Sequence, residues 1–557
     1  MIAQILALAL AVDGGTDSRW VLLDAMAQEL ERNQKTLKLK ENAPPYFLSY
    51  QLKDIDERDV AARYGAVFRD EASREKLLYV DARVGSYAFD SSRDPDFDFS
   101  FSSKGTSFTA RKTAPLDDNP QALRTALWLI TDEKYKAALF DYLKKKGEDV
   151  YTVEDPKRAP SFSKETPVTF IGPRVAFPFD RERWSQVART LSSQAAKSKA
   201  IIDSEVRVHA QKTLRSFVSS EGSRLITEDT LYSIVFSAVA RAEDGQLLDN
   251  GRAFYAPTEA GLPSVEVLTR EHAQMVEELV RLRNAPAVDP YTGPAILEAD
   301  AAGVLFHEAV GHRLEGHRQD DENEGKTFKG QVGKPVLPSF ISIHDDPTQA
   351  VAFGQPLNGH YRYDDEGVAA QRVSLVESGV LKSYLLSRKL VDGFSQSNGH
   401  GRSQGNRRPV SRMANLVVTS TKQVADSDLK KMLLAEAKRQ GKPYGLVIRD
   451  ITGGNTNTSS YGYQAFKGIP RMVFRVDVRD GKETLVRGVE MVGTPLSSMN
   501  RIVATGKTSG VFNGFCGAES GAVPVSTVAP ALLLQEVELQ RVAEGKDRPP
   551  VLPSPYD

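Results

Sequence analysis

The sequence lacks three features that would narrow its class at once. Its 557 residues include a single cysteine, Cys516, so no disulfide can form within the chain and the compartment stays open. The 72 basic and 73 acidic side chains give a net charge of −1, which offers no general electrostatic case for nucleic acid or an anionic membrane. Walker-type glycine loops, CxxC pairs and dinucleotide fingerprints are also missing. A disulfide scaffold is therefore excluded, and nucleotide or nucleic-acid binding has no support.

Long hydrophobic runs are scarce as well. Residues 2–12 are apolar and contain Ala7-Leu8-Ala9, a small-residue pattern typical of signal-peptide cleavage sites. The basic residues that should precede such a segment are missing, and the run falls far short of the roughly 20 residues that cross a bilayer. Residues 1–12 are thus either a signal segment or the first turns of a buried helix. The location is cytoplasmic or, with a signal, periplasmic or exported, and no stable membrane insertion is expected.

Length and proline placement together predict two domains. A chain of 557 residues is too long for one hydrophobic core. Its 40% hydrophobic and 26% charged residues are typical of a globular protein. Pro286, Pro290 and Pro294 mark the domain boundary. We expect an α+β fold, with an N-terminal domain of helices and a mixed sheet over 13–285 and a strand-rich C-terminal domain over 286–557 that carries the metal helix.

Hydrophobic periodicity predicts the individual elements of both halves. Helices are expected over 19–35, 120–146, 181–201, 268–284 and 427–440. In the first half, strands are expected over 46–52, 61–69 and 75–87, and several more between 206 and 242. In the second half, strands are expected over 369–376, 380–386, 414–420, 444–450, 471–479 and 483–491.

The most informative stretch is His307-Glu308-Ala309-Val310-Gly311-His312. Neutral imidazole is a good zinc ligand, and a neighbouring carboxylate can take the proton from a metal-bound water. The better-known peptidase spacing, H-E-x-x-H, places both histidines on one helical face. Here the second histidine comes one residue later. On a regular helix five residues turn by about 140° and rise by about 7.5 Å, so the two imidazoles would point too far apart to share an ion.

The spacing therefore predicts an interrupted helix. We expect a helix from about Ala299 that is widened or ended near Gly311, because a residue without a β-carbon most easily absorbs the distortion. The apolar run 303–306 indicates that this helix is buried, and buried ionisable groups need partners. The alternative is a helix that carries two surface histidines and a solvated glutamate.

These residues and the blocks that follow them resemble the TldD/PmbA family of metallopeptidases, whose signature is H-E-x-x-x-H. The similar blocks occur in the family's order and cover nearly all of residues 290–535. They are Leu314-Glu315-Gly316, Gly330-Gln331-Val332-Gly333, Asp364-Asp365-Glu366-Gly367, Ser411-Arg412-Met413-Ala414-Asn415, Arg487-Gly488-Val489, Cys516-Gly517 and Val523-Pro524-Val525. The N-terminal half fits the family in outline only. Because the chain retains the histidine motif, it resembles the active subunits and not their motif-less partners.

The resemblance implies a zinc peptidase with one Zn²⁺ per chain. Carried over residue by residue, His307, His312 and Cys516 are the metal ligands and Glu308 is the general base. A thiolate is a strong zinc ligand, and Cys516 stands in a glycine-rich stretch that we expect to be a loop. Considered alone, a single cysteine is more often a buried apolar residue.

The resemblance also implies what the protein binds. Its substrates would be extended, unstructured peptides in a cleft between the domains. It would form a dimer, either with a like chain or with a motif-less family partner, and no nucleic-acid partner is expected. One alternative is a non-catalytic peptide-binding subunit with a structural metal. Another is a sugar or amide hydrolase with the same metal, although nothing in the sequence indicates a sugar-binding surface.

Other polar residues receive weaker interpretations. Arg412, part of a basic run with Arg402, and His360 are candidates for substrate binding. His317 is expected to be a surface histidine, with a rival ligand or a proton donor as alternatives. Residues 364–366 form either an acidic group that orients a ligand histidine or a solvated turn.

Overall fold

The computed structural model describes residues 17–92, 110–149, 159–320, 324, 326–456, 458, 466–493, 499–542 and 552. The expected signal segment, residues 1–12, lies outside the described residues. Across the described ranges, none of the helices combines the length and the apolar character needed to cross a bilayer.

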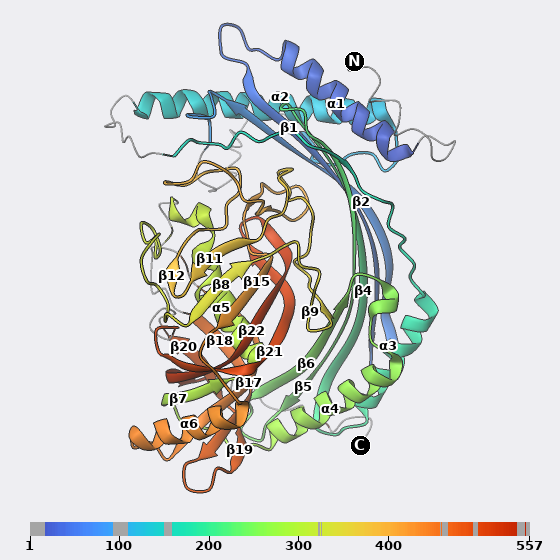
Figure 1. The fold of residues 1–557 in the computed structure, drawn as a ribbon. Coiled ribbons are helices and arrows are strands. Elements are labelled where there is room, and N and C mark those ends of the chain that lie inside the picture. The colour runs from blue at the N-terminus through green and yellow to red at the C-terminus, as the bar shows by residue number, and fades with distance from the viewer. Residues whose placement is uncertain are drawn as a thin grey trace.

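The N-terminal half is a long curved sheet with helices at both of its ends (Figure 1). The strand order is β2-β1-β4-β5, and β3 and β6 both pair with the outer edge of β5. Its elements are α1 (Ser18–Thr36), β1 (Pro45–Arg63), β2 (Ala66–Val84), α2 (Pro120–Asp149), β3 (Thr169–Ile171), α3 (Arg181–Ala196), β4 (Ile201–Ser219), β5 (Arg224–Arg241), β6 (Leu247–Ala256), a 3-10 turn at Glu259–Gly261, and α4 (Val265–Arg283).

The prediction of three short strands between residues 46 and 87 is wrong, because β1 and β2 are two strands of 19 residues each. They meet at Tyr64 and Gly65, whose φ angles are 51° and 82°. Two successive positive φ angles make the tight turn that closes a hairpin. The charged part of β1 did not look like a strand, but its charges are paired across the sheet: Arg207 Nε on β4 donates to Asp59 at 2.7 Å.

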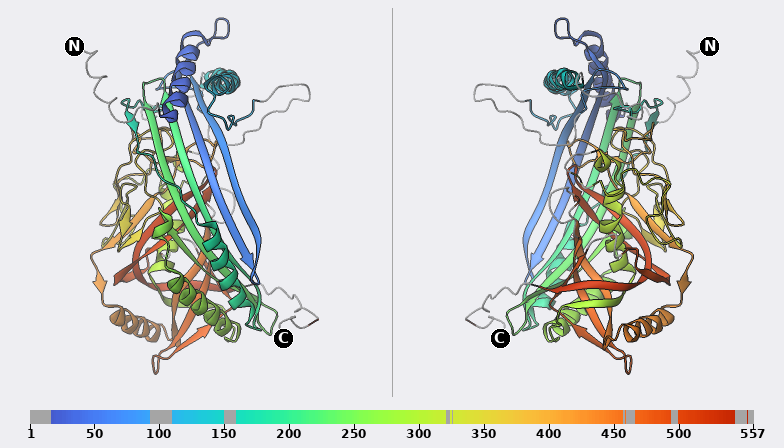
Figure 2. Two further views of the ribbon diagram at one scale, coloured as in Figure 1. Left: turned by 90° about the vertical axis from the view of Figure 1, so that its right-hand side faces the viewer. Right: turned by 90° about the vertical axis from the view of Figure 1, so that its left-hand side faces the viewer.

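Two apolar clusters hold the helices against this sheet. At one end, Leu23 and Met26 of α1 and Leu127 of α2 pack on Leu48 and Tyr50 of β1. At the other end, a second cluster joins α3 and α4 to β4, β5 and β6, and includes Trp184, Leu191, Val208, Ile234, Phe236, Met275 and Leu279. Figure 2 shows β1, β2, β4 and β5 running between these two ends of the molecule. The face away from α1–α4 is therefore available to the rest of the chain.

The C-terminal half forms a 12-stranded sheet, in which nine strands follow in the order β12-β11-β8-β15-β22-β20-β18-β17-β7. The other three are attached to this path, because β19 pairs with β18, β21 with β22 and β16 with β21. Because β22 also pairs with β7, the strands β22, β20, β18, β17 and β7 close into a ring. The first elements are β7 (Tyr291–Leu297), α5 (Ala299–Ala309), 3-10 turns at Gly311–Leu314 and Gly316–Gln319, β8 (Ile341–Asp345), β9 (Val351–Ala352), β10 (Gln355–Pro356), β11 (Val373–Glu377), β12 (Val380–Leu381), β13 (Gly401–Arg402) and β14 (Val410–Ser411). The later ones are β15 (Asn415–Ser420), β16 (Gln423–Val424), α6 (Asp426–Arg439), β17 (Tyr444–Thr456), β18 (Phe466–Asp477), β19 (Glu483–Val486), β20 (Val489–Gly493), β21 (Ile502–Ala518) and β22 (Gly521–Arg541).

The α+β class and the strand-rich second half are confirmed, but the two longest late strands, β21 and β22, were not predicted. β22 is buried from Val525 to Leu534, and its sequence there, apolar apart from Ser526 and Thr527, shows no alternation. Pro524 and Pro530 also argued against a strand. We propose that the domain boundary lies near residue 285, between α4 and β7, because each side has its own sheet and core.

The C-terminal domain lies inside the curve of the N-terminal sheet, and a buried ion cluster joins the two (Figure 1). Asp365 Oδ1 is 3.0 Å from Lys53 Nζ on β1 and 2.8 Å from Arg215 Nε on β4. Burial alone would raise the pKa of Asp365, but the two cations hold it at about 2. Both interpretations of residues 364–366 are therefore wrong. Asp365 joins the domains, and Asp364 accepts hydrogen bonds from the N–H groups of Val368 and Gly401.

Replacement of Asp365 by asparagine should lower the free energy of unfolding by about 3 kcal/mol at neutral pH, because two buried cations lose their partner. The folded carboxyl has a pKa of about 2, against 3.8 when unfolded. The contribution of this carboxylate to the free energy of unfolding is complete above the unfolded pKa of 3.8. It is lost as the pH falls through the folded pKa of about 2. The difference between wild type and Asp365→Asn in urea unfolding should therefore shrink between pH 4 and pH 2.

The matched control is Asp132→Asn, which removes an exposed carboxylate paired with Lys136 on α2. Such a pair contributes about 0.5 kcal/mol or less. A loss for Asp365→Asn no greater than for this control would contradict the role of the buried cluster.

Candidate metal centre

The helix that carries the first histidine ends where the spacing requires it to end. α5 stops at Ala309, and Gly311–Leu314 continue as a 3-10 turn. The rings of His307 and His312 come to 5.1 Å between centroids, with their planes at 88°. The prediction of a helix ended near Gly311 so that the two imidazoles converge is confirmed. Both histidines are buried, so the alternative of two surface histidines is wrong.

Gly311 is needed for space and not for an unusual backbone angle. A β-carbon at this position would lie 2.1 Å from Met413 Sδ, inside any real contact distance. Arg313 stabilises the same turn, because its Nη1 donates to the carbonyl oxygens of Glu308 at 3.0 Å and Ala309 at 3.2 Å. These carbonyls at the end of α5 have no partner within the helix. The turn is thus fixed from both sides.

Cys516 reaches the histidines from a strand and not from the expected loop. It lies on β21 opposite Val523 of β22 and is buried. Its Sγ is 3.3 Å from His312 Nε2, and one ligand atom from each of His307, His312 and Cys516 lies within 4.8 Å of the other two. His307 Nδ1 is buried without a hydrogen-bond partner among the described residues. Two imidazoles and a thiol at such distances fit a zinc ion.

The electrostatics of the three side chains favour a cation between them. Burial alone would raise the pKa of the Cys516 thiol, but the imidazoles of His312 and His307 hold it well below its usual value. Burial opposes charge on His312 too, yet Cys516 and Glu315 raise its pKa to about 10. The two side chains thus favour each other's charged forms, a thiolate beside an imidazolium. A thiolate is the form of cysteine that binds metals.

Glu315 orients His312 from behind. It is fully buried, and its Oε2 lies 3.0 Å from His312 Nδ1 and 2.8 Å from Arg318 Nε. A histidine whose Nδ1–H is donated to a carboxylate presents Nε2 as its lone pair, and Nε2 is the atom that faces Cys516. From the sequence, Glu315 is named only within the family block 314–316 and has no role assigned to it. The available signal was a carboxylate three positions after a candidate ligand.

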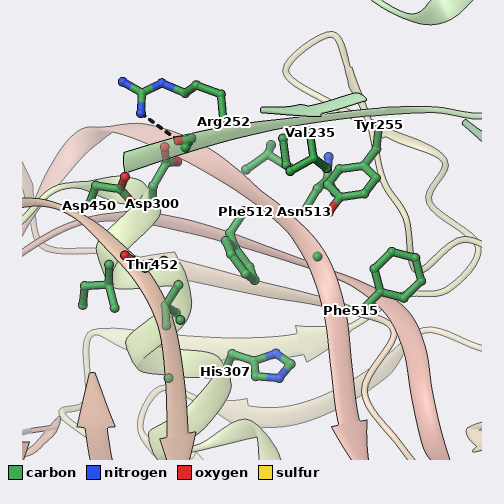
Figure 3. Close-up of a pocket in the computed structure, with 18 of the residues that line it drawn as sticks. Val235, Arg252, Tyr255, Asp300, His307, Asp450, Thr452, Phe512, Asn513 and Phe515 are labelled. Atoms are coloured by element: carbon green, nitrogen blue, oxygen red, sulfur yellow. Dashed lines mark hydrogen bonds between the residues drawn. The ribbon is translucent and has the colours of Figure 1, made fainter. Parts of the chain in front are cut away.

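A cavity of about 1360 Å³ lies in front of these residues. One wall is made by β5 and β6 of the N-terminal sheet, and the other by α5, β17 and β21 (Figure 3). His307, Glu308, His312 and Cys516 all line it. The remaining lining is mixed: it includes the apolar side chains of Val235, Tyr255, Phe512 and Phe515 and the charged ones of Arg252, Asp300 and Asp450. The site therefore opens into a space large enough for several peptide residues.

Two residues predicted to bind substrate do not line this cavity. Arg412 is fully buried, and its Nη2 donates to the Cys516 carbonyl at 2.6 Å. His360 is exposed elsewhere, with its Nδ1 2.9 Å from the Pro347 carbonyl. Arg412 is therefore held inside the protein, where Nη1 and Nη2 donate to the turn between β21 and β22 and to the Cys516 carbonyl. His360 faces a different part of the surface.

The expectation that His317 is a surface histidine is also wrong. It is buried, its Nδ1 lies 2.8 Å from Ser411 Oγ, and its Nε2 contacts the carboxylate of Glu519. Both ring nitrogens are engaged, so His317 is not a rival ligand. Ser411 and Glu519 are remote in sequence, which is why no local pattern revealed this position.

Several known proteins resemble this chain in sequence. Residues 290–541 match the family model for the PmbA/TldA metallopeptidase C-terminal domain. A metalloprotease from Methanocaldococcus jannaschii is 28% identical over 319 residues, which are 56% of this chain and 64% of that one, so less than two thirds of this relative is matched. A zinc metalloprotease TldD homolog from Saccharolobus solfataricus is 25% identical over 332 residues, 58% of this chain and 68% of that one.

The fold is also shared with a solved structure. TldE from Thermococcus kodakarensis has a TM-score of 0.61 at 14% identity, with 93% of this chain and 100% of that chain covered. At this identity the match shows the fold alone. The fold, the motif and the matched C-terminal domain define a metallopeptidase-type protein. Its C-terminal domain, residues 290–541, belongs to the TldD/PmbA family of metallopeptidases, so the resemblance predicted from the sequence is confirmed.

Replacement of Gly311 by alanine should disturb the end of α5. The added methyl group meets Met413 Sδ, and such overpacking costs about 1–3 kcal/mol. We expect a lower unfolding temperature and weaker zinc binding, measured by thermal unfolding and by competition with a chelating dye. Gly147→Ala on α2 is the control, because a β-carbon there meets no atom within 4 Å.

If the clash with Met413 causes the effect of Gly311→Ala, removing the Met413 side chain should relieve it. In the double variant Gly311→Ala with Met413→Ala, the space vacated by the thioether should restore part of the zinc affinity. Unchanged zinc binding in Gly311→Ala would contradict the account of the turn.

Proposed function

We propose that this protein is a zinc-dependent peptidase that hydrolyses extended, unstructured peptides in the cavity between its two domains. The observation that carries this proposal is the convergence of His307, His312 and Cys516 beside Glu308 on the cavity wall. A relative named a zinc metalloprotease supports the choice of metal. The set of two nitrogens and one sulfur is also one that zinc favours.

His307, His312 and Cys516 would hold one Zn²⁺ per chain and leave a coordination position open towards the cavity. When bound, the zinc ion lowers the pKa of a water molecule and polarises the scissile carbonyl. Glu308 directly follows a ligand, is half-buried and lines the cavity. Its carboxylate would accept the proton of the attacking water and return it to the leaving amine. Glu308 is therefore proposed as the general base.

The walls of the cavity suit a peptide that lies extended. Among the described strands, residues 510–518 of β21 pair only with β22, and β6 pairs only with β5. Both strands contribute to the cavity lining, and β21 carries Cys516. A free strand edge binds an extended chain through main-chain hydrogen bonds, which tolerate many side chains. Folded proteins cannot present such a strand to an enclosed site.

The assembly proposed with this function is a dimer, either of two like chains or of this chain with a motif-less family partner. A dimer would enclose the cavity further and exclude folded proteins more strictly. Nucleic acid has no place in this proposal, since the net charge is −1.

Glu308→Gln tests the chemistry. The amide cannot accept a proton, so kcat/KM on an unstructured peptide should fall by a factor of about 10²–10⁴ while bound zinc stays at the wild-type level. The control is Glu298→Gln, which changes another carboxylate at the start of the same helix but outside the cavity lining. Peptide cleavage and metal content are measured on the same samples.

The outcomes separate the candidate functions. Equal cleavage by wild type and Glu308→Gln would exclude Glu308 as the general base. If neither protein cleaves any peptide while both retain zinc, the chain is a non-catalytic peptide-binding subunit with a structural metal.

A mixed peptide library tests metal dependence and substrate class together. With zinc present, unstructured peptides should be cut at many sequences, and a chelator should abolish cleavage. A stably folded small protein included in the same mixture should stay intact. Mass spectrometry of the products also gives the cleavage rule. Cleavage that survives the chelator, or digestion of the folded protein, would contradict the proposal.

A further inference from the structure

We propose that Arg412 is a positioning residue that sets the separation between His312 and Cys516 and thereby the affinity of the site for zinc. Arg412 acts in this way only if the three side chains bind zinc as proposed above. Arg412 itself does not line the cavity, so it acts on the site through the residues that it contacts. Its guanidinium instead connects the surroundings of two ligands that no shared element holds together.

On one side, the guanidinium binds the hairpin that carries Cys516. Nη2 donates to the Cys516 carbonyl at 2.6 Å. Nη1 donates to Ser520 Oγ at 2.8 Å and to the Gly521 carbonyl at 3.0 Å. These acceptors lie at the turn between β21 and β22. The position of the Cys516 main chain is therefore fixed directly by this side chain.

On the other side, the guanidinium faces the carboxylate behind His312. Arg412 Nε lies 3.4 Å from Glu315 Oε1, an ion pair between two fully buried side chains. The other oxygen, Glu315 Oε2, contacts His312 Nδ1 at 3.0 Å. A single planar group thus spans from the partner of one ligand to the main chain of another.

This link matters because the two ligands are 204 residues apart in sequence and belong to different elements. Nothing local keeps His312 Nε2 at 3.3 Å from Cys516 Sγ. Lysine cannot replace the arginine, since an ammonium group is a single point and cannot bind the hairpin and the carboxylate at once. Loss of one such supporting group typically weakens metal binding by a factor of about 10–100.

The chain offers a matched control in Arg402. It is also buried, and its Nη1 and Nη2 donate to the carbonyls of Met413 at 2.5 Å and Pro524 at 2.8 Å. These two hydrogen bonds and its contact with the Tyr361 ring involve neither Glu315 nor any of the three ligands. Arg402→Lys therefore removes a buried guanidinium from the same region without cutting the proposed link.

The test compares Arg412→Lys, Arg402→Lys and wild type by zinc affinity, measured by competition with a chelating dye. Cobalt-loaded samples add a spectroscopic readout, because the thiolate-to-cobalt absorption band reports the contact between Cys516 and the metal. Arg412→Lys should bind zinc about 10–100-fold more weakly and show a weaker band. Arg402→Lys should stay within about twofold of wild type.

Glu315→Gln cuts the same link at its other end while keeping the shape of the side chain. It should also weaken zinc binding. Because Arg412 and Glu315 act as one unit, the double variant Arg412→Lys with Glu315→Gln should bind zinc no more weakly than whichever single variant binds it less tightly. If Arg412→Lys does not fold, Glu315→Gln carries the test alone.

Wild-type zinc affinity in Arg412→Lys, equal weakening in Arg402→Lys, or wild-type affinity in Glu315→Gln would each overturn the role of Arg412. Failure of the wild-type protein itself to bind zinc would instead overturn the proposed function. The two failures are therefore distinguishable in one set of measurements.

Discussion

The site depends on the end of one helix. Had α5 continued past Ala309, the five-residue spacing would have turned His312 away from His307 by about 140°. The helix stops instead, and a 3-10 turn carries His312 back to a ring distance of 5.1 Å. Gly311 allows this turn to pack on Met413, and Arg313 caps the free carbonyls. A motif one residue longer than the familiar peptidase spacing thus reaches a similar arrangement by ending the helix.

Two long-range arrangements complete what the turn begins. The β21–β22 hairpin brings Cys516 to His312, and Glu315 with its arginine partners holds the imidazole from behind. The N-terminal sheet then covers the open side and supplies one wall of the cavity. The buried cluster around Asp365 holds that sheet against the C-terminal domain. The contacts of Asp365 with Lys53 and Arg215 therefore also hold in place the wall that faces the candidate metal site.

Sequence reasoning succeeded where the signal was local. The interrupted helix followed from the spacing of two histidines, and the candidate ligands followed from a family resemblance that the C-terminal match confirms. It failed where a residue's partner is remote. Asp365 was interpreted as part of a ligand-orienting group or a solvated turn, and Arg412 as a substrate-binding residue, yet both are buried against groups more than 100 residues away. The buried strand β22 showed no alternation, and Cys516 looked like a loop residue because glycines flank it.

The central claim is that two imidazoles and the Cys516 thiolate share one zinc ion. X-ray absorption at the zinc edge on the loaded protein tests it most directly, because sulfur and nitrogen neighbours scatter at different distances. The account predicts one sulfur at about 2.3 Å together with imidazole nitrogens at about 2.0–2.1 Å, and loss of the sulfur in Cys516→Ser. A zinc shell made of nitrogen and oxygen alone in the wild-type protein would contradict it.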